Sequence, residues 1–142
     1  MTPDAIVPAA STPAEIAALF ARFEVAMSDA SIVGQSADGR YLDAYTAGFL
    51  LAKIAVRASG YRVKGGENHH DTFAALEVLM GSSSRESADA LNAARKYRNQ
   101  DMYDAAGMVD AADVAALLAR VTTFEGEVRA WLAKHHPELL PA

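Results

Sequence analysis

The sequence predicts an all-α protein, an antiparallel up-and-down helical bundle of about five helices. Apolar residues recur at steps of three and four over long stretches, which is the period of an amphipathic helix. No stretch alternates apolar and polar residues with the period of two, so we expect no sheet. Alanine, which loses no side-chain entropy in a helix, is abundant. The segments between the periodic stretches are short, which favours neighbouring helices that run antiparallel.

The first two helices are bounded by recognisable end signals. Thr12 is a predicted N-cap, with Pro13 at the first helical position and Glu15 at the capping-box position. After a loop over 34–39, a second helix is expected from about 40 to 59. It carries apolar residues on more than one side, so it lies at the centre of the bundle or is shared with a partner subunit.

The remaining helices follow the same rules. Residues 61–68 contain two adjacent glycines and no helical period, so this segment is expected to be a loop. A third helix is predicted over about 71–80 and a fourth over about 85–104. The fifth begins at Asp110, keeps its apolar period over a long stretch and ends before Pro137.

Length and composition bound the domain organisation and the function classes. The chain has 142 residues, so we expect a flexible leader over 1–11, one helical domain over 12–136 and a C-terminal tail over 137–142. It has no cysteine, which excludes disulfides, thiolate metal sites and cysteine nucleophiles. The formal net charge of −5 does not suit general binding of nucleic acid or membranes. No signal peptide or membrane-spanning segment is apparent, so a cytoplasmic protein is expected.

The basic residues are concentrated in two segments. No acidic residue lies between Asp43 and Glu67, and the second segment is on the fourth predicted helix. The basic residues concerned are Lys53, Arg57, Arg62 and Lys64 in the first segment and Arg95, Lys96 and Arg98 in the second. If the second and fourth helices pack side by side, they form one positive patch that can hold a phosphate. Alternatively, both segments form a solvated face that pairs with carboxylates of the first and fifth helices.

Arg98 is the most informative of these residues. On a helical period it shares a face with Leu91, Ala94 and Met102. Because a guanidinium on an apolar stripe stays charged, it must pair with a carboxylate, reach water or lie at an interface. Arg95, Asn99 and Tyr103 form a neighbouring row, either a phosphate-contacting surface or an interhelical hydrogen-bond network.

Several segments together resemble the HEPN family of all-helical domains. The fourth predicted helix reads ALNAARKYRNQDMYD, and it is preceded by GYRVK at 60–64 and by His69-His70-Asp71 at the start of the third helix. HEPN domains occur beside minimal nucleotidyltransferases and in toxin–antitoxin, phage-defence and RNA-processing systems. Their hallmark is an arginine followed by Asn, Asp or His, and then a histidine a few residues later. Arg98 and Asn99 match the first half, and Tyr103 stands where the histidine is expected.

The resemblance implies a homodimer and, in the ribonuclease members, metal-independent RNA cleavage by an arginine and a histidine of two subunits. Tyrosine, with a pKa near ~10, is a poor general base at neutral pH. We therefore expect a binding or regulatory HEPN module that takes RNA, a nucleotide or a partner such as a nucleotidyltransferase. The alternative is a divergent ribonuclease toxin whose catalytic residues are Arg98, Asn99 and Tyr103. A third possibility is a helical interaction protein unrelated to nucleic acid.

The predicted phosphate-binding residues come from both basic segments and the histidine pair. They are Arg95, Lys96, Arg62, Lys64, His69 and His70. The two histidines are adjacent, so on a helix their side chains point about 100° apart, which does not suit a shared metal ion. A structural role at the start of a helix is the simpler reading of the pair, and we expect neither a metal nor a cofactor.

Overall fold

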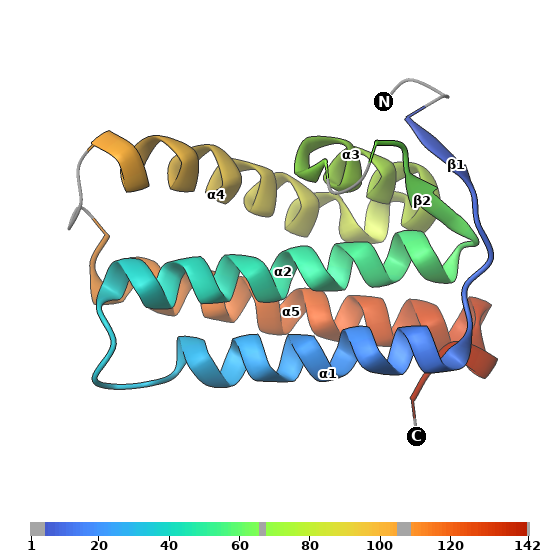
Figure 1. The fold of residues 1–142 in the computed structure, drawn as a ribbon, viewed down its shortest axis with the longest axis horizontal. Coiled ribbons are helices and arrows are strands. Elements are labelled where there is room, and N and C mark those ends of the chain that lie inside the picture. Colours follow the sequence, from blue (N-terminus) through green and yellow to red (C-terminus); the bar gives the residue numbers. More distant parts are fainter. Residues whose placement is uncertain (1–4, 66–67, 105–108, 142) are drawn as a thin grey trace.

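The fold is mainly helical, as predicted (Figure 1). The computed structural model describes residues 5–65, 68–104 and 109–141, and of residues 98–104 it describes the backbone only. The helices and strands in chain order are β1 (Ile6–Pro8), α1 (Pro13–Ala30), α2 (Ala37–Ala58), β2 (Tyr61–Val63), α3 (His69–Met80), α4 (Arg85–Asp104) and α5 (Ala111–His135). Two 3-10 turns, Gly81–Ser84 and Pro137–Leu139, follow α3 and α5.

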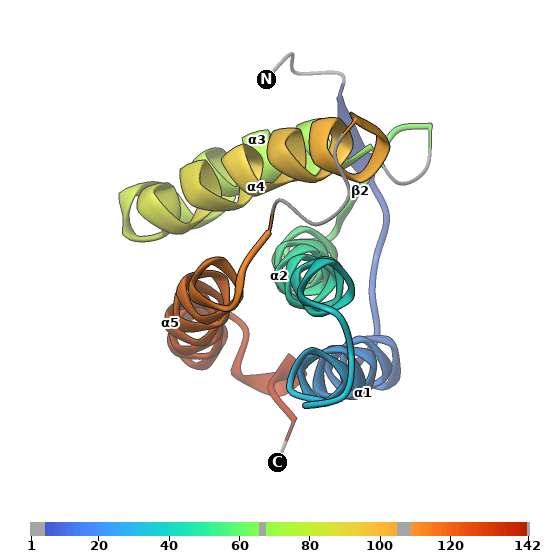
Figure 2. The same cartoon turned by 90° about the vertical axis from the view of Figure 1, so that its left-hand side faces the viewer.

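The long helices α1, α2, α4 and α5 lie side by side, and each runs opposite to the long helix before it (Figures 1 and 2). The shorter α3 packs against α2 and against the first half of α4. Helix α2 lies at the centre, in contact with α1, α3, α4 and α5. This central position explains its apolar residues on all sides, so the apolar content of α2 does not require a partner subunit.

Local capping sets where several helices begin. The Thr12 hydroxyl accepts a hydrogen bond from the N–H of Glu15 (3.2 Å), so α1 begins at Pro13 as predicted. Asp110 and Asp113 form a reciprocal capping box at the start of α5. Helix α2 begins at Ala37, before the predicted position, because the Ser36 hydroxyl caps it by accepting from the N–H of Gly39.

The expectation that the chain forms no sheet is wrong. Strands β1 and β2 pair antiparallel, with Ile6 opposite Val63 and Pro8 opposite Tyr61. The strands therefore lie within the predicted leader and the predicted loop over 61–68. Each is three residues long, too short to show an alternating pattern. Gly60, with φ of 85°, adopts the left-handed conformation between the end of α2 and β2.

The C-terminal segment also packs on the bundle. Leu139, in the predicted tail, is buried and belongs to the core. The turn that carries it contacts α1 and α5. The core is thus closed at this end by residues that follow Pro137.

Candidate functional site

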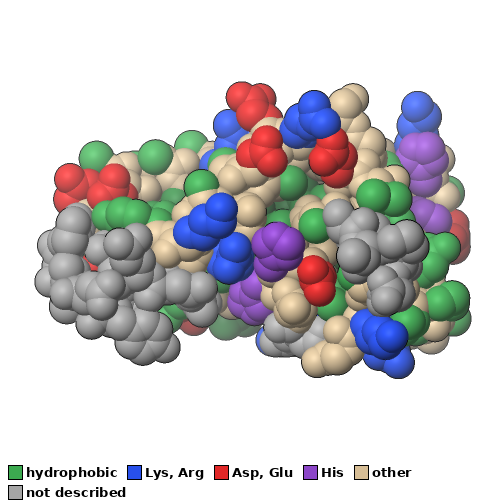
Figure 3. Space-filling view, turned by 90° about the horizontal axis from the view of Figure 1, so that it is seen from above, with side chains coloured by type: hydrophobic (Ala, Val, Ile, Leu, Met, Phe, Trp, Pro, Cys, Tyr) green, Lys and Arg blue, Asp and Glu red, His purple; other side chains and the backbone are tan. Residues whose placement is uncertain are grey.

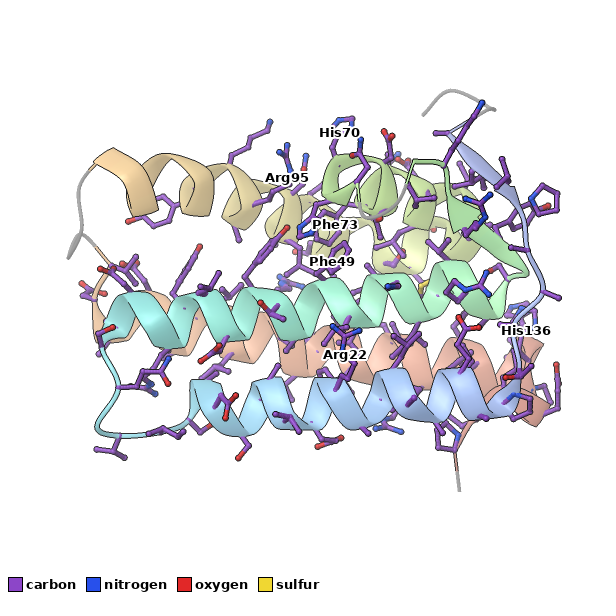
Figure 4. The ribbon with its side chains drawn as sticks, in the orientation of Figure 1. Arg22, Phe49, His70, Phe73, Arg95 and His136 are labelled. Carbon is purple, nitrogen blue, oxygen red and sulfur yellow. The ribbon has the colours of Figure 1, made fainter. Side chains whose placement is uncertain are left out.

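A basic face lies where α3 meets α4. Its residues are His70 in the first turn of α3 and Arg95 and Lys96 on α4, and we call it the α3–α4 face. Figure 4 shows Arg95 and His70 on the same side of the molecule, and Figure 3 shows basic side chains beside histidine there. A cleft of about 80 Å³ between the helices is lined by His70, Phe73 and Asn92, among others.

Arg95 and Lys96 have no carboxylate partner among the described side chains. The Arg95 Nε donates to the neutral amide oxygen Oδ1 of Asn92 (2.9 Å), and Lys96 is exposed. Other arginines are paired with glutamates, for example Arg85 with Glu77 and Arg129 with Glu125. Lys96 therefore presents its charge to solvent, and the half-buried Arg95 beside it keeps a charge that no described carboxylate neutralises, so a phosphate can approach the pair.

The two histidines that were predicted to bind phosphate, His69 and His70, have different surroundings. His69 Nδ1 lies 2.7 Å from the hydroxyl oxygen of the buried Tyr45, and its ring stacks on Phe49 with 3.8 Å between ring centroids. His70 is exposed, with its Nδ1 3.3 Å from Oδ1 of Asp71. His69 thus anchors the start of α3, as the structural reading of the pair expects, and only His70 faces the outside. The prediction that His69 contacts phosphate is not supported by this geometry, because the ring is held between α2 and α3.

The first basic segment does not join the α3–α4 face. Arg57 is bound to Glu15, with 2.5 Å between Nε and Oε2, so its charge is used within the protein. Lys53 and Arg62 line a separate pocket beside this ion pair. Lys64 is exposed just after β2. The single patch predicted from the two segments is therefore divided, since α2 directs its basic residues toward α1 and β2.

The residues that carry the HEPN resemblance lie in the last part of α4. The backbone of Arg98, Asn99 and Tyr103 is helical. Their side chains lie outside the described residues, so their predicted catalytic roles stay predictions. One feature of this helix was not anticipated from the sequence. Tyr97 packs against Tyr41 of α2 (5.6 Å between ring centroids) beside a groove of about 460 Å³ between α4 and α5.

Two further observations limit the chemistry of the part of the chain that the structure describes. It contains no group of three or more His, Asp or Glu side chains placed to hold a metal ion. None of its helices combines the length and the apolar character that a membrane span requires.

Comparisons with protein-family models, curated proteins and solved structures found no match to this chain. The function of the chain is therefore inferred from the chemistry of its own surfaces, together with the sequence resemblance.

Proposed function

We propose that this chain is a HEPN-like helical module that binds the phosphate backbone of RNA through the α3–α4 face and acts as a homodimer. The observation that carries the proposal is the pair formed by the half-buried Arg95 and the exposed Lys96, which lie beside His70 without a carboxylate partner among the described side chains. The net charge of the chain is −5, so a local cluster of unpaired cations is not a consequence of general basicity. Such a cluster attracts a polyanion even when the rest of the surface repels it.

The HEPN resemblance makes RNA the first ligand to test. Arg98 and Asn99 follow Arg95 and Lys96 on the same helix, so the motif and the α3–α4 face are continuous in sequence. A nucleotide or a nucleotidyltransferase partner would use the same cations. Competition of RNA binding by a mononucleotide would identify a nucleotide as the ligand. Binding of a nucleotidyltransferase by a protein that does not bind RNA would identify the partner as the ligand.

The double variant Arg95→Gln/Lys96→Gln is expected to bind RNA with lower affinity. Its affinity is also expected to depend less steeply on salt concentration. Each phosphate contact to a single strand contributes about 0.7 to the slope of log K against log salt, so two lost contacts reduce the slope by about 1.4. Fluorescence anisotropy of a labelled single-stranded RNA over a salt series measures both quantities. An unchanged slope would show that these side chains do not contact phosphate.

The matched control is Arg22→Gln/Lys134→Gln, which removes the same charge from exposed positions on α1 and α5. It is expected to leave the slope nearly unchanged. If the control weakens binding as much as the site variant does, the protein binds RNA only through its overall charge. The same RNA incubated in EDTA tests the ribonuclease alternative. Cleavage by the unmodified protein that is lost in Arg98→Ala would favour a divergent HEPN ribonuclease.

The homodimer is expected from the resemblance alone, because α2 is covered by helices of its own chain. Light scattering at micromolar concentration is expected to give a mass near twice 15.1 kDa. A mass of 15.1 kDa would exclude a site shared between two subunits. It would leave RNA binding by the α3–α4 face of a monomer as the remaining proposal.

A further inference from the structure

A pocket of about 540 Å³ lies at the end of the molecule where α2, α3 and α5 finish, and we call it the end pocket (Figure 1). Its lining includes Tyr61 of β2, Val78 of α3 and Trp131 of α5. Val78 is 65% exposed, and Tyr61 and Trp131 are half-buried, so a ligand can reach these side chains from solvent. The volume lies within the range of small-molecule sites. None of the lining residues belongs to the α3–α4 face.

Aromatic rings are concentrated in the end pocket. Trp131 is the only tryptophan of the chain, and its ring centroid lies 5.1 Å from that of His136 and 6.0 Å from that of His135. Figure 4 shows His136 at this end of the molecule. Tyr61 contributes a further ring from β2. Because the face of an aromatic ring carries partial negative charge and attracts a cation, most strongly for tryptophan, the lining suits a cation with an apolar surface.

Three helix C-termini meet at the same pocket. Ser59 is the C-cap of α2, Met80 is the last residue of α3 and His135 is the last residue of α5, and all three line the pocket. The carbonyl groups at a helix C-terminus together carry about half a negative charge, so each of these ends favours a nearby cation. The described lining residues include none from α1 or α4, whose N-termini would have the opposite effect.

The cations in the last turns of these helices do not line the pocket. Arg57, near the end of α2, is bound to Glu15 and to backbone carbonyls. Lys134, near the end of α5, is exposed and is not a lining residue, and α3 has no basic residue in its last turn. The helix ends and the aromatic rings therefore favour the same kind of ligand, a cation that comes from solution.

The described lining residues include no Asp or Glu, and this decides which kind of cation suits the pocket. A primary ammonium has three N–H donors, which would need acceptors after leaving water. A quaternary ammonium has no N–H donor, and aromatic rings hold its methyl-covered surface by cation–π attraction. We propose that the end pocket binds the quaternary ammonium group of a free small molecule of the choline class. This inference does not depend on the proposed RNA binding.

Choline is the test ligand, with dimethylbutanol and ethanolamine as matched probes. Dimethylbutanol has carbon in place of the nitrogen and so keeps the shape without the charge, whereas ethanolamine keeps the charge without the methyl groups. Because Trp131 is the only tryptophan, its fluorescence reports binding at the pocket directly. Choline is expected to change this fluorescence saturably and to bind about tenfold tighter than either probe. The titrations are made at pH 8, because protonated His135 or His136 would repel the cation.

Variants separate recognition by the rings from a structural effect. Tyr61→Leu removes a ring and is expected to weaken choline binding about fivefold, whereas Tyr61→Phe keeps the ring without the hydroxyl and is expected to keep the affinity. Trp131→Leu is expected to weaken binding about tenfold, measured by calorimetry because the fluorophore is lost. The matched control, Tyr41→Leu, changes a half-buried tyrosine of α2 that does not line the pocket, and it is expected to leave choline affinity unchanged.

Four outcomes would overturn the proposal. The first two are no saturable change of Trp131 fluorescence at tens of millimolar choline, and equal affinity for choline and dimethylbutanol. The third is full choline affinity in both Tyr61→Leu and Trp131→Leu. The fourth is sedimentation of the protein with phosphatidylcholine vesicles that free choline does not reverse, which would assign the pocket to a lipid head group instead of a free molecule. Failure of RNA binding would not bear on the proposal, because the α3–α4 face and the end pocket share no residue.

Discussion

Replacing Gly48 with leucine is expected to lower the free energy of unfolding by about 3 kcal/mol. A Cβ on Gly48 would lie 2.5 Å from Cδ2 of Leu91 on α4 and 3.3 Å from Cγ2 of Val121 on α5. Both neighbours are fully buried, so neither side chain can move into solvent to make room. The leucine can be accommodated only if α2 separates from α4 and α5. Urea unfolding followed by circular dichroism measures the loss.

Gly126 on α5 provides the matched control. No atom lies within 4 Å of a Cβ built on Gly126, so Gly126→Leu adds a side chain in open space. Because leucine favours a helix over glycine by up to about 1 kcal/mol, this variant is expected to be neutral or slightly more stable. Equal losses in the two variants would contradict the close approach of the helices at Gly48. The same approach sets how far α4 stands from α2, and so fixes the position of the α3–α4 face.

Features that depend on neighbouring residues could be predicted from the sequence. The start of α1 at Pro13 and the start of α5 after Asp110 are set by side chains three residues from the groups they bond. The bounds of α4 and the long apolar period of α5 were likewise predicted, since both are properties of continuous segments. Local chemistry of this kind survives in any fold that keeps the helix.

The small sheet could not be predicted because its support is distant in sequence. Arg57 bonds the carbonyl of Ala9, 48 residues away, and that of Tyr61, and so fastens the segments beside both strands. Nothing in a three-residue strand indicates such a partner. The position of α2 at the centre was one of two readings of its apolar faces, and only the packing of the other helices distinguishes them.

Only part of the candidate site could be predicted, because some of its contacts join residues that are distant in sequence. Arg95 and Lys96 are adjacent on one helix, so their proximity follows from the sequence, whereas their freedom from carboxylates does not. His69 and His70 look equivalent in sequence. They differ because Tyr45 and Phe49 of α2 hold the ring of His69, a contact between residues at least 20 apart. The separation of Arg62 from the α3–α4 face depends on where β2 pairs, which was the feature that the sequence did not reveal.

Replacing Arg57 with methionine is expected to lower the free energy of unfolding by about 2–3 kcal/mol. Methionine keeps an unbranched apolar stem but removes the hydrogen bonds to Glu15 and to the carbonyls of Ala9, Ala10 and Tyr61. The Arg57 side chain is only 13% exposed, so water replaces these bonds poorly. Urea unfolding measures the loss, and faster hydrogen exchange of the Ala9 amide would locate it at the sheet, since this amide donates to Gly60.

Arg85→Met is the matched control for this variant. Arg85 also pairs with a glutamate, Glu77, but the two side chains are 63% and 54% exposed. Exposed ion pairs contribute little to stability, so the control is expected to lose much less stability than Arg57→Met. Similar losses in the two variants would mean that Arg57 acts as an ordinary surface cation.

The pH dependence of the Arg57→Met effect identifies the partner. The hydrogen bond from Arg57 lowers the pKa of Glu15 in the folded protein below its value in the unfolded chain. A carboxylate with a lowered pKa adds stability above its unfolded pKa, and that stability is lost as pH falls through the folded pKa. The difference in unfolding free energy between the unmodified protein and Arg57→Met is therefore expected to shrink between about pH 5 and pH 3. A difference that stays constant over this range would show that the bonds to the backbone carbonyls, which do not titrate, account for the whole effect.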